Sequence, residues 1–173
     1  MKKQTKFIIG FMILLIIIIG VLLFFNRGSA LEGQGAEQDR TFTVKVDGNE
    51  VVTFTLDALK EMESETFPAV IRSSGKKPEE VTYTGVEIGL LLETAGIDLK
   101  DKKQLTFTAL DGYVVTAGVK ELAETGNFYL AYGLNGEDLK TKSEEGNGPY
   151  QLIIRKDPFS QRWCKYLKEV DIQ

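Results

Sequence analysis

The chain has 173 residues, with 21 basic and 25 acidic side chains, no histidine and one cysteine. The lack of histidine excludes Ser-His-Asp and Cys-His catalytic pairs and imidazole metal ligands, and a lone cysteine excludes an intrachain disulfide and a multi-thiolate zinc or iron–sulfur site. The net charge is −4, and the basic residues are dispersed without forming a stripe. A nucleic-acid partner is therefore not expected, because binding phosphates needs clustered positive charge.

The N-terminal residues 1–25 predict a cytoplasmic stub and a membrane anchor. Residues 7–25 form an unbroken run of 19 apolar or glycine residues. A helix of that length reaches about 28 Å, close to the hydrocarbon thickness of a bilayer. Three lysines precede the run and only Arg27 follows closely. This imbalance predicts a single-pass protein of the cell membrane with a cytoplasmic N-terminus and an extracytoplasmic domain.

A cleavable signal peptide is the competing interpretation of the same run. The small residues 28–30 offer a cleavage position. However, the apolar core of a secretory signal usually spans about 7–15 residues, and this run is longer. Both interpretations place the remainder of the chain outside the cytoplasm. Residues 26–40, rich in Gly, Gln and charge, are interpreted as a flexible linker, and residues 41–173 as the domain.

The domain shows frequent turn signals and more strand patterns than helix patterns. Its predicted elements, in chain order, are strands at 41–46 and 51–55, a short helix at 57–62, a strand at 67–72, a polar loop at 73–80, a helix at 85–95, strands at 105–110 and 113–116, a short helix at 120–124, a strand at 128–133, a polar loop at 140–148, an apolar strand at 150–154 and a weakly alternating tail after residue 158. We expect the strand at 150–154 to be central and the tail to close the sheet.

The helix predicted at 85–95 has the clearest start and stop signals. Thr84 and Glu87 have the spacing of a capping box, and Gly96 is a natural residue to follow the last turn. Asp47-Gly48 and Asn135-Gly136 are hairpin-turn signals. The pattern as a whole predicts an α+β domain with a mixed β-sheet and a few short helices.

Six segments occur in the order and spacing typical of one family. They are TFTLDALKEM (53–62), YTGVEIGLLLETAG (83–96), TALDGY (108–113), YLAYGLNGEDL (129–139), GPYQLII (148–154) and RWCKYL (162–167). Together they resemble the molybdopterin-binding domain of the sulfite oxidase-like oxidoreductases, over residues 41–173. The resemblance implies that family's fold, in a reduced version, and a cleft that once held a molybdenum cofactor.

The chain departs from the family pattern at the positions that hold the cofactor. The family binds molybdenum through one cysteine thiolate, and the resemblance aligns Ser73 with that position. A serine hydroxyl is a harder and far less acidic donor than a thiol. The family's His-Gly-x-Pro-x-Arg loop corresponds to residues 146–151, which contain neither the His nor the Arg. We therefore expect no bound cofactor and no metal, with molybdopterin retained only in an alternative with an unusual ligand set.

The resemblance also implies a ligand-binding site in the former cofactor cleft. The residues it places there are Arg72, Ser73, Ser74, Asp111, Tyr113, Asn147 and Gln151. Each has a plainer interpretation as part of a polar loop or a hairpin turn. No residue is assigned as catalytic.

Three hypotheses for the function follow. The first is a non-catalytic binding module that takes a small-molecule ligand or a membrane-protein partner in the former cleft. The second is a molybdopterin-dependent oxidoreductase, or a subunit of one, with an unusual ligand set. The third is a structural surface protein that uses the fold as a scaffold.

Overall fold

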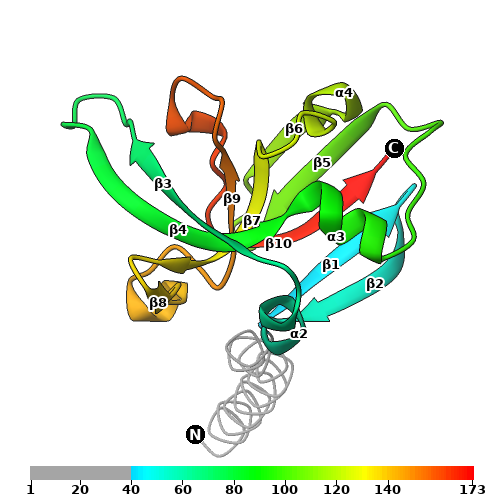
Figure 1. Ribbon diagram of the computed structural model, residues 1–173, viewed down its shortest axis with the longest axis horizontal. Coiled ribbons are helices and arrows are strands. Elements are labelled where there is room, and N and C mark those ends of the chain that lie inside the picture. The colour runs from blue at the N-terminus through cyan, green and yellow to red at the C-terminus, as the bar shows by residue number, and fades with distance from the viewer. Residues whose placement is uncertain (1–39) are drawn as a thin grey trace, which may run out of the picture. The chain divides into compact units, whose positions relative to one another are not determined.

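Two five-stranded sheets make up residues 40–173, the part of the chain that the computed structural model describes (Figure 1). The anchor predicted at 7–25 lies outside these residues, as does the predicted linker except for Arg40. Across residues 40–173, no helix has the length and apolar character needed to cross a bilayer. Arg40 belongs to the folded unit rather than to the linker. Its carbonyl oxygen accepts hydrogen bonds from the Tyr150 hydroxyl at 2.7 Å and from the Leu56 amide at 3.2 Å.

The first sheet is assembled from both ends of the domain. Its strands, in spatial order, are β2 (Asn49–Thr55), β1 (Thr41–Val46), β10 (Leu167–Ile172), β5 (Gln104–Ala109) and β6 (Val114–Gly118). The tail thus forms the central strand β10, parallel to β1 and antiparallel to β5. A register shift between Leu167 and Glu169 explains why its alternation is weak in the sequence. The tail is a strand of a sheet, as expected, but it lies at the centre of that sheet instead of closing it.

The second sheet is built around one fully apolar strand. Its strands are β3 (Glu65–Ile71), β4 (Glu79–Glu87), β7 (Phe128–Leu134) and β8 (Glu137–Asp138), and β9 (Gln151–Ile154) pairs with β7 beside β8. The predicted central place of the 150–154 segment is wrong, because β9 pairs with β7 alone. Its other side is covered by the chain that follows: Leu152 donates to the Cys164 carbonyl at 2.8 Å, and Leu167 donates to the Tyr150 carbonyl at 2.9 Å. The strand is therefore buried without being central.

The predicted helix start at residues 84–87 is also wrong. These residues continue β4, and helix α3 covers only Ile88–Thr94. Gly85 explains why: a Cβ at this position would lie 2.4 Å from the carbonyl oxygen of Leu130 on β7. The two strands can approach so closely only because glycine has no side chain. The two expected capping side chains make other hydrogen bonds. The Thr84 hydroxyl is hydrogen-bonded to the Thr66 hydroxyl at 3.0 Å, and the Glu87 carboxylate accepts from the Gly126 amide at 2.6 Å.

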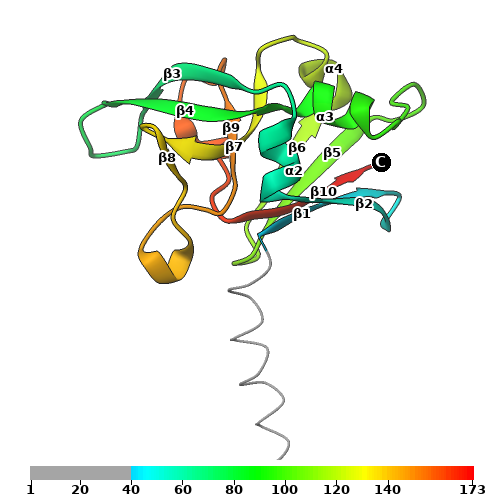
Figure 2. The same ribbon diagram turned by 60° about the horizontal axis from the view of Figure 1, so that its bottom comes forward.

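Short helical segments join the strands. Those that connect one sheet to the other are α2 (Leu56–Glu61), α3, α4 (Val119–Leu122) and the 3-10 turn η2 (Ser160–Arg162), whereas the 3-10 turn η1 (Lys142–Glu144) lies between β8 and β9 of the second sheet. Thr55 caps α2 by accepting from the Ala58 amide at 3.2 Å. Figure 2 shows β3 and β4 on one side, β1, β2 and β10 on the other, and α2 between them.

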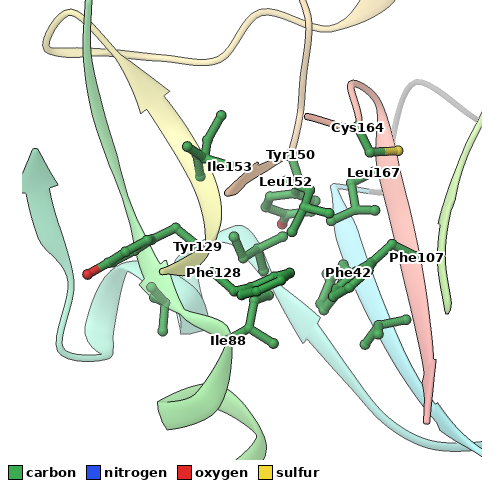
Figure 3. Close-up of a cluster of buried hydrophobic side chains, with 14 of the residues drawn as sticks. Phe42, Ile88, Phe107, Phe128, Tyr129, Tyr150, Leu152, Ile153, Cys164 and Leu167 are labelled. Carbon is green, nitrogen blue, oxygen red and sulfur yellow. The ribbon is translucent and has the colours of Figure 1, made fainter. Parts of the chain in front are cut away.

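The two sheets share one hydrophobic core. Figure 3 shows Phe42 of β1, Phe107 of β5, Phe128 of β7 and Ile88 of α3 in the same cluster, and all four are buried. The rings of Phe107 and Phe128 join the two sheets with their centroids 6.3 Å apart. The α+β class with mixed strand directions is confirmed, with the strands divided between two sheets instead of one.

Candidate functional site

The connection between β9 and β10 contacts two of the segments that carry predicted ligand-binding residues. The Arg72 amide donates to the Ser160 hydroxyl at 2.9 Å, and the Ser160 amide donates to the Arg72 carbonyl at 3.3 Å. The Tyr113 hydroxyl donates to the Gln161 carbonyl at 2.9 Å. Asp111 accepts from the Tyr113 amide at 3.1 Å, which stabilises the β5–β6 turn as the plainer interpretation predicts. The η2 turn therefore lies between the β3 and β6 sides of this end of the domain.

Gln151 and Asn147 lie in different surroundings from Arg72. Gln151 is only 3% exposed, and its Oε1 accepts from the Tyr83 hydroxyl at 3.3 Å inside the protein. Burial raises the pKa of Tyr83 to about 12, so this phenol remains a hydrogen-bond donor at neutral pH. Asn147 is tied to the chain by its carbonyl, which accepts from the Tyr166 amide at 2.8 Å. The structure does not bring the seven predicted residues into one cleft.

A cleft of about 250 Å³ opens beside Arg72. It is lined by Pro68, Ala69 and Val70 of β3, Arg72, Arg155, Asp157 and Trp163. Of the seven predicted residues only Arg72 takes part. The other lining residues were not among those predicted, although the charged residues directly after the buried strand 151–154 were an available signal.

The charges of this cleft are paired, with one exception. Arg155 donates to the Glu65 carboxylate at 3.3 Å and stacks over the Phe67 ring at 4.7 Å from the centroid. Asp157 accepts two hydrogen bonds from the Arg162 guanidinium, at 2.8 and 2.5 Å. The hydrogen bonds from Arg162 to Asp157 raise the pKa of the guanidinium, which stays charged. The guanidinium of Arg72 has no ion pair or hydrogen bond with any side chain of residues 40–173.

A second, larger cleft of about 490 Å³ lies on the β7–β8 side. It is lined by Leu134, Asn135, Glu137, Asp138, Leu139, Lys140, Glu145, Gly146 and Asn147. The acidic residues are already partly neutralised, since Asp138 forms an ion pair with Lys60 at 2.7 Å. Asn147 is the predicted residue found here. This cleft and the Arg72 cleft have no lining residue in common.

The two positions relevant to a metal thiolate are Ser73 and Cys164. Ser73 is exposed in the β3–β4 connection, where its carbonyl accepts from the Lys76 amide at 3.2 Å. Cys164 is completely buried and lies in the core cluster of Figure 3. Burial, followed by the nearby charge of Asp111, raises the pKa of the Cys164 thiol to about 12. Throughout residues 40–173, no three Cys, Asp or Glu side chains are gathered in a way that could hold a metal ion.

Residues 32–173 match the family model described as the oxidoreductase molybdopterin binding domain, and the chain therefore belongs to that family. Among solved structures, the fold is similar to the crystal structure of the sulfane dehydrogenase SoxCD from Paracoccus pantotrophus. The TM-score is 0.62, with 19% identity over 79% of this chain. The chain spans only 38% of the SoxCD chain, and at this identity the likeness shows the fold alone. A comparison with curated proteins gives no significant match.

The donor set of this chain does not fit a molybdenum cofactor held by a protein thiolate. The position that the family resemblance assigns to the ligand carries the Ser73 hydroxyl, and a hydroxyl is a poor substitute for a soft thiolate. The one thiol, Cys164, is enclosed by core side chains and stays protonated at neutral pH because of its raised pKa. Neither side chain is suited to hold a soft transition metal.

Proposed function

We propose that this chain is a membrane-anchored, extracytoplasmic domain that uses the molybdopterin-binding fold as a non-catalytic module for binding a ligand or a partner protein. The observation that carries the proposal is the placement of sulfur. The chain has one cysteine, and its side chain is completely buried in the hydrophobic core. A metal bound by a protein thiolate requires an accessible, ionised sulfur, and Cys164 is neither accessible nor ionised at neutral pH.

The loop at residues 146–151 supports the same interpretation. The resemblance implies that a histidine and an arginine of this loop would contact the cofactor or an anionic substrate. Gln151 stands at the position of the arginine, and its amide bonds inward to the Tyr83 hydroxyl. The loop is therefore used to hold the core together, and it presents no cation to an anion.

The location rests on the apolar run at residues 7–25 and its flanking lysines. Reporter fusions test it: an alkaline phosphatase joined after residue 173 is expected to be active, and a fluorescent protein that folds only in the cytoplasm is expected to be dark there. The opposite pattern would contradict the extracytoplasmic placement. Neutralising the three lysines before the run is expected to weaken the preference for this orientation.

Molybdenum content is the decisive measurement for the non-catalytic assignment. The full-length chain, produced in a host that makes the cofactor, is expected to contain far less than one molybdenum per chain by elemental analysis. A matched variant, Ser73→Cys, restores sulfur at the position implied by the family resemblance. Cys164→Ser, which changes the buried thiol, is expected to leave the metal content unchanged.

A molybdopterin-dependent oxidoreductase with an unusual ligand set is the second candidate. It is favoured by membership of an oxidoreductase family and by a fold shared with a sulfane dehydrogenase. Under this alternative, the unmodified chain would carry molybdenum and pterin in about equal amounts, near one per chain. That result would overturn the non-catalytic proposal.

A further inference from the structure

The outer edge of β3 is free along most of its length. β3 pairs with β4 on one side, and it is the last strand of its sheet. The Arg72 cleft is lined by Pro68, Ala69 and Val70 of this strand, together with Arg155, Asp157 and Trp163. An exposed strand edge presents unpaired backbone donors and acceptors, and it is a template for adding another strand.

Two observations identify which backbone groups of β3 point away from β4. Thr82 of β4, the partner of Pro68, uses both of its backbone groups on its far side, bonding to Asn135 at 2.9 and 2.7 Å. The backbone of Pro68 therefore faces the outer edge, where its carbonyl can accept but its nitrogen has no hydrogen to donate. The backbone groups of Arg72 also point away from β4, to Ser160. Because the pattern alternates along a strand, the amide and carbonyl of Val70 point outward as well.

The edge is closed at one end and positively charged there. Ser160 occupies both backbone groups of Arg72, so a strand added along β3 cannot continue past this residue. In Figure 1 the η2 connection lies beside the end of β3 where the strand stops. Arg72 lines the cleft, and its guanidinium has no partner among the side chains of residues 40–173. An added chain would therefore end next to an unneutralised cation.

We propose that the free edge of β3 binds the extended C-terminal segment of a partner protein, with the terminal carboxylate at Arg72. A chain terminus is required because Ser160 closes the edge. The charge selects the carboxyl end over the amino end, since a terminal ammonium would be repelled by the guanidinium. The bound segment runs parallel to β3, because β3 itself runs toward Arg72. This inference rests on the proposed non-catalytic function, and it assigns the partner class and the surface.

The backbone contacts and the charge contribute separately. The outward amide and carbonyl of Val70 hold the peptide as a strand, and these contacts do not depend on its side chains. Arg72 binds the terminal carboxylate through charge-assisted hydrogen bonds. Arg155 is held over the Phe67 ring and paired with Glu65, so it forms part of the cleft wall and is not free to bind the carboxylate.

The test uses the full-length chain in detergent and two random heptapeptide libraries, one with free C-terminal carboxylates and one with C-terminal amides. We expect enriched sequences in the carboxylate library only. The best labelled peptide is then measured by fluorescence anisotropy against four variants. Val70→Pro removes the outward amide and is expected to weaken binding about fivefold or more, whereas Val70→Ala keeps the amide and binds nearly as the parent does. Thermal melts of each variant verify that it is folded.

The second pair of variants tests the charge. Arg72→Gln is expected to weaken binding about tenfold or more, and to remove most of the preference for the carboxylate over the amide form of the same peptide. Lys76→Gln removes one positive charge from the same β3–β4 connection but not from the cleft lining, and less than a twofold change is expected.

Three outcomes would overturn the inference: no enrichment in either library, equal enrichment in both, or equal binding by the Arg72→Gln and Lys76→Gln variants. The same protein preparation is analysed for molybdenum, so that failure of the β3-edge site can be distinguished from failure of the proposed non-catalytic function. A metal-free chain that selects no peptide overturns only the β3-edge site. A chain with about one molybdenum per molecule overturns the proposed function, whatever the libraries show.

Discussion

The reactivity of Cys164 is the most direct quantitative consequence of the structure. The pKa of this thiol is raised from 9.0 to about 12, so near pH 8 the thiolate fraction falls from about one in ten to about one in ten thousand. A thiolate of higher pKa is also more nucleophilic, and this raises the rate per thiolate by a factor of about 15–30. Ionisation alone therefore predicts a reaction with a disulfide reagent about 30–60 times slower than that of an ordinary thiol, and complete burial slows it further.

The assay follows the release of thionitrobenzoate from Ellman's reagent by the folded, full-length chain. The matched control is the double variant Ser73→Cys with Cys164→Ala, which moves the one thiol to an exposed position of the β3–β4 connection. We expect the control to react at the rate of a free thiol and the parent chain to react far more slowly. In urea, the parent is expected to reach the rate of the control.

The opposite result is a parent chain that reacts within about tenfold of the control without denaturant. Such a rate would mean that Cys164 is accessible and ionised. Cys164 would then be a candidate metal ligand, and a thiolate-held molybdenum could no longer be ruled out on the ground of its burial. A slow parent reaction together with a fast control supports the core position of Cys164.

Three further predictions concern stability. Gly85→Ala forces a Cβ to 2.4 Å from a carbonyl oxygen of β7 and is expected to lower the free energy of unfolding by about 1–3 kcal/mol in urea melts. Gly89→Ala, on α3 with open space at its Cβ, is the control and is expected to stabilise by up to about 1 kcal/mol, so equal losses would contradict the β4–β7 contact. Arg162→Met removes two hydrogen bonds to the Asp157 carboxylate and one to Glu121, and it is expected to cost about 1–3 kcal/mol, which thermal melts at neutral pH would detect. An unchanged melt would show that these contacts of Arg162 contribute nothing. The free energy of unfolding is expected to fall between pH 10 and about pH 12, because the unfolded chain releases the Tyr83 proton near pH 10 and the folded chain retains it to about 12. The slope over this range should be smaller in Tyr83→Phe, and an unchanged slope would exclude Tyr83 as its source.

Features encoded within a few neighbouring residues could be predicted from the sequence. Asp47-Gly48 and Asn135-Gly136 form turns with positive φ at both residues, as such dipeptides predict, because the preference lies in the local backbone. The family was recognised because turns and short motifs keep their order along the chain, and the match over residues 32–173 confirms it. The absence of histidine and the scarcity of sulfur limited the chemistry before any fold was known.

Other features depended on contacts between residues far apart in the sequence. Residues 84–87 have a local helix-start signal, but pairing with β7 at Gly85 holds them in a strand. The grouping of the predicted ligand-binding residues also required the fold. Arg72 and Asn147 line different clefts, and Gln151 is buried. No local sequence pattern distinguishes the environments of these three residues, since each environment depends on what packs against the residue.

Composition alone shows that this chain has no imidazole and a single thiol, too few donors for most metal chemistry, and its local turns suit a sheet-rich domain. Folding places that thiol in the core and leaves one edge of β3 open beside an unpaired arginine. Composition limits which donors exist, whereas burial and strand pairing determine which of them can reach a ligand.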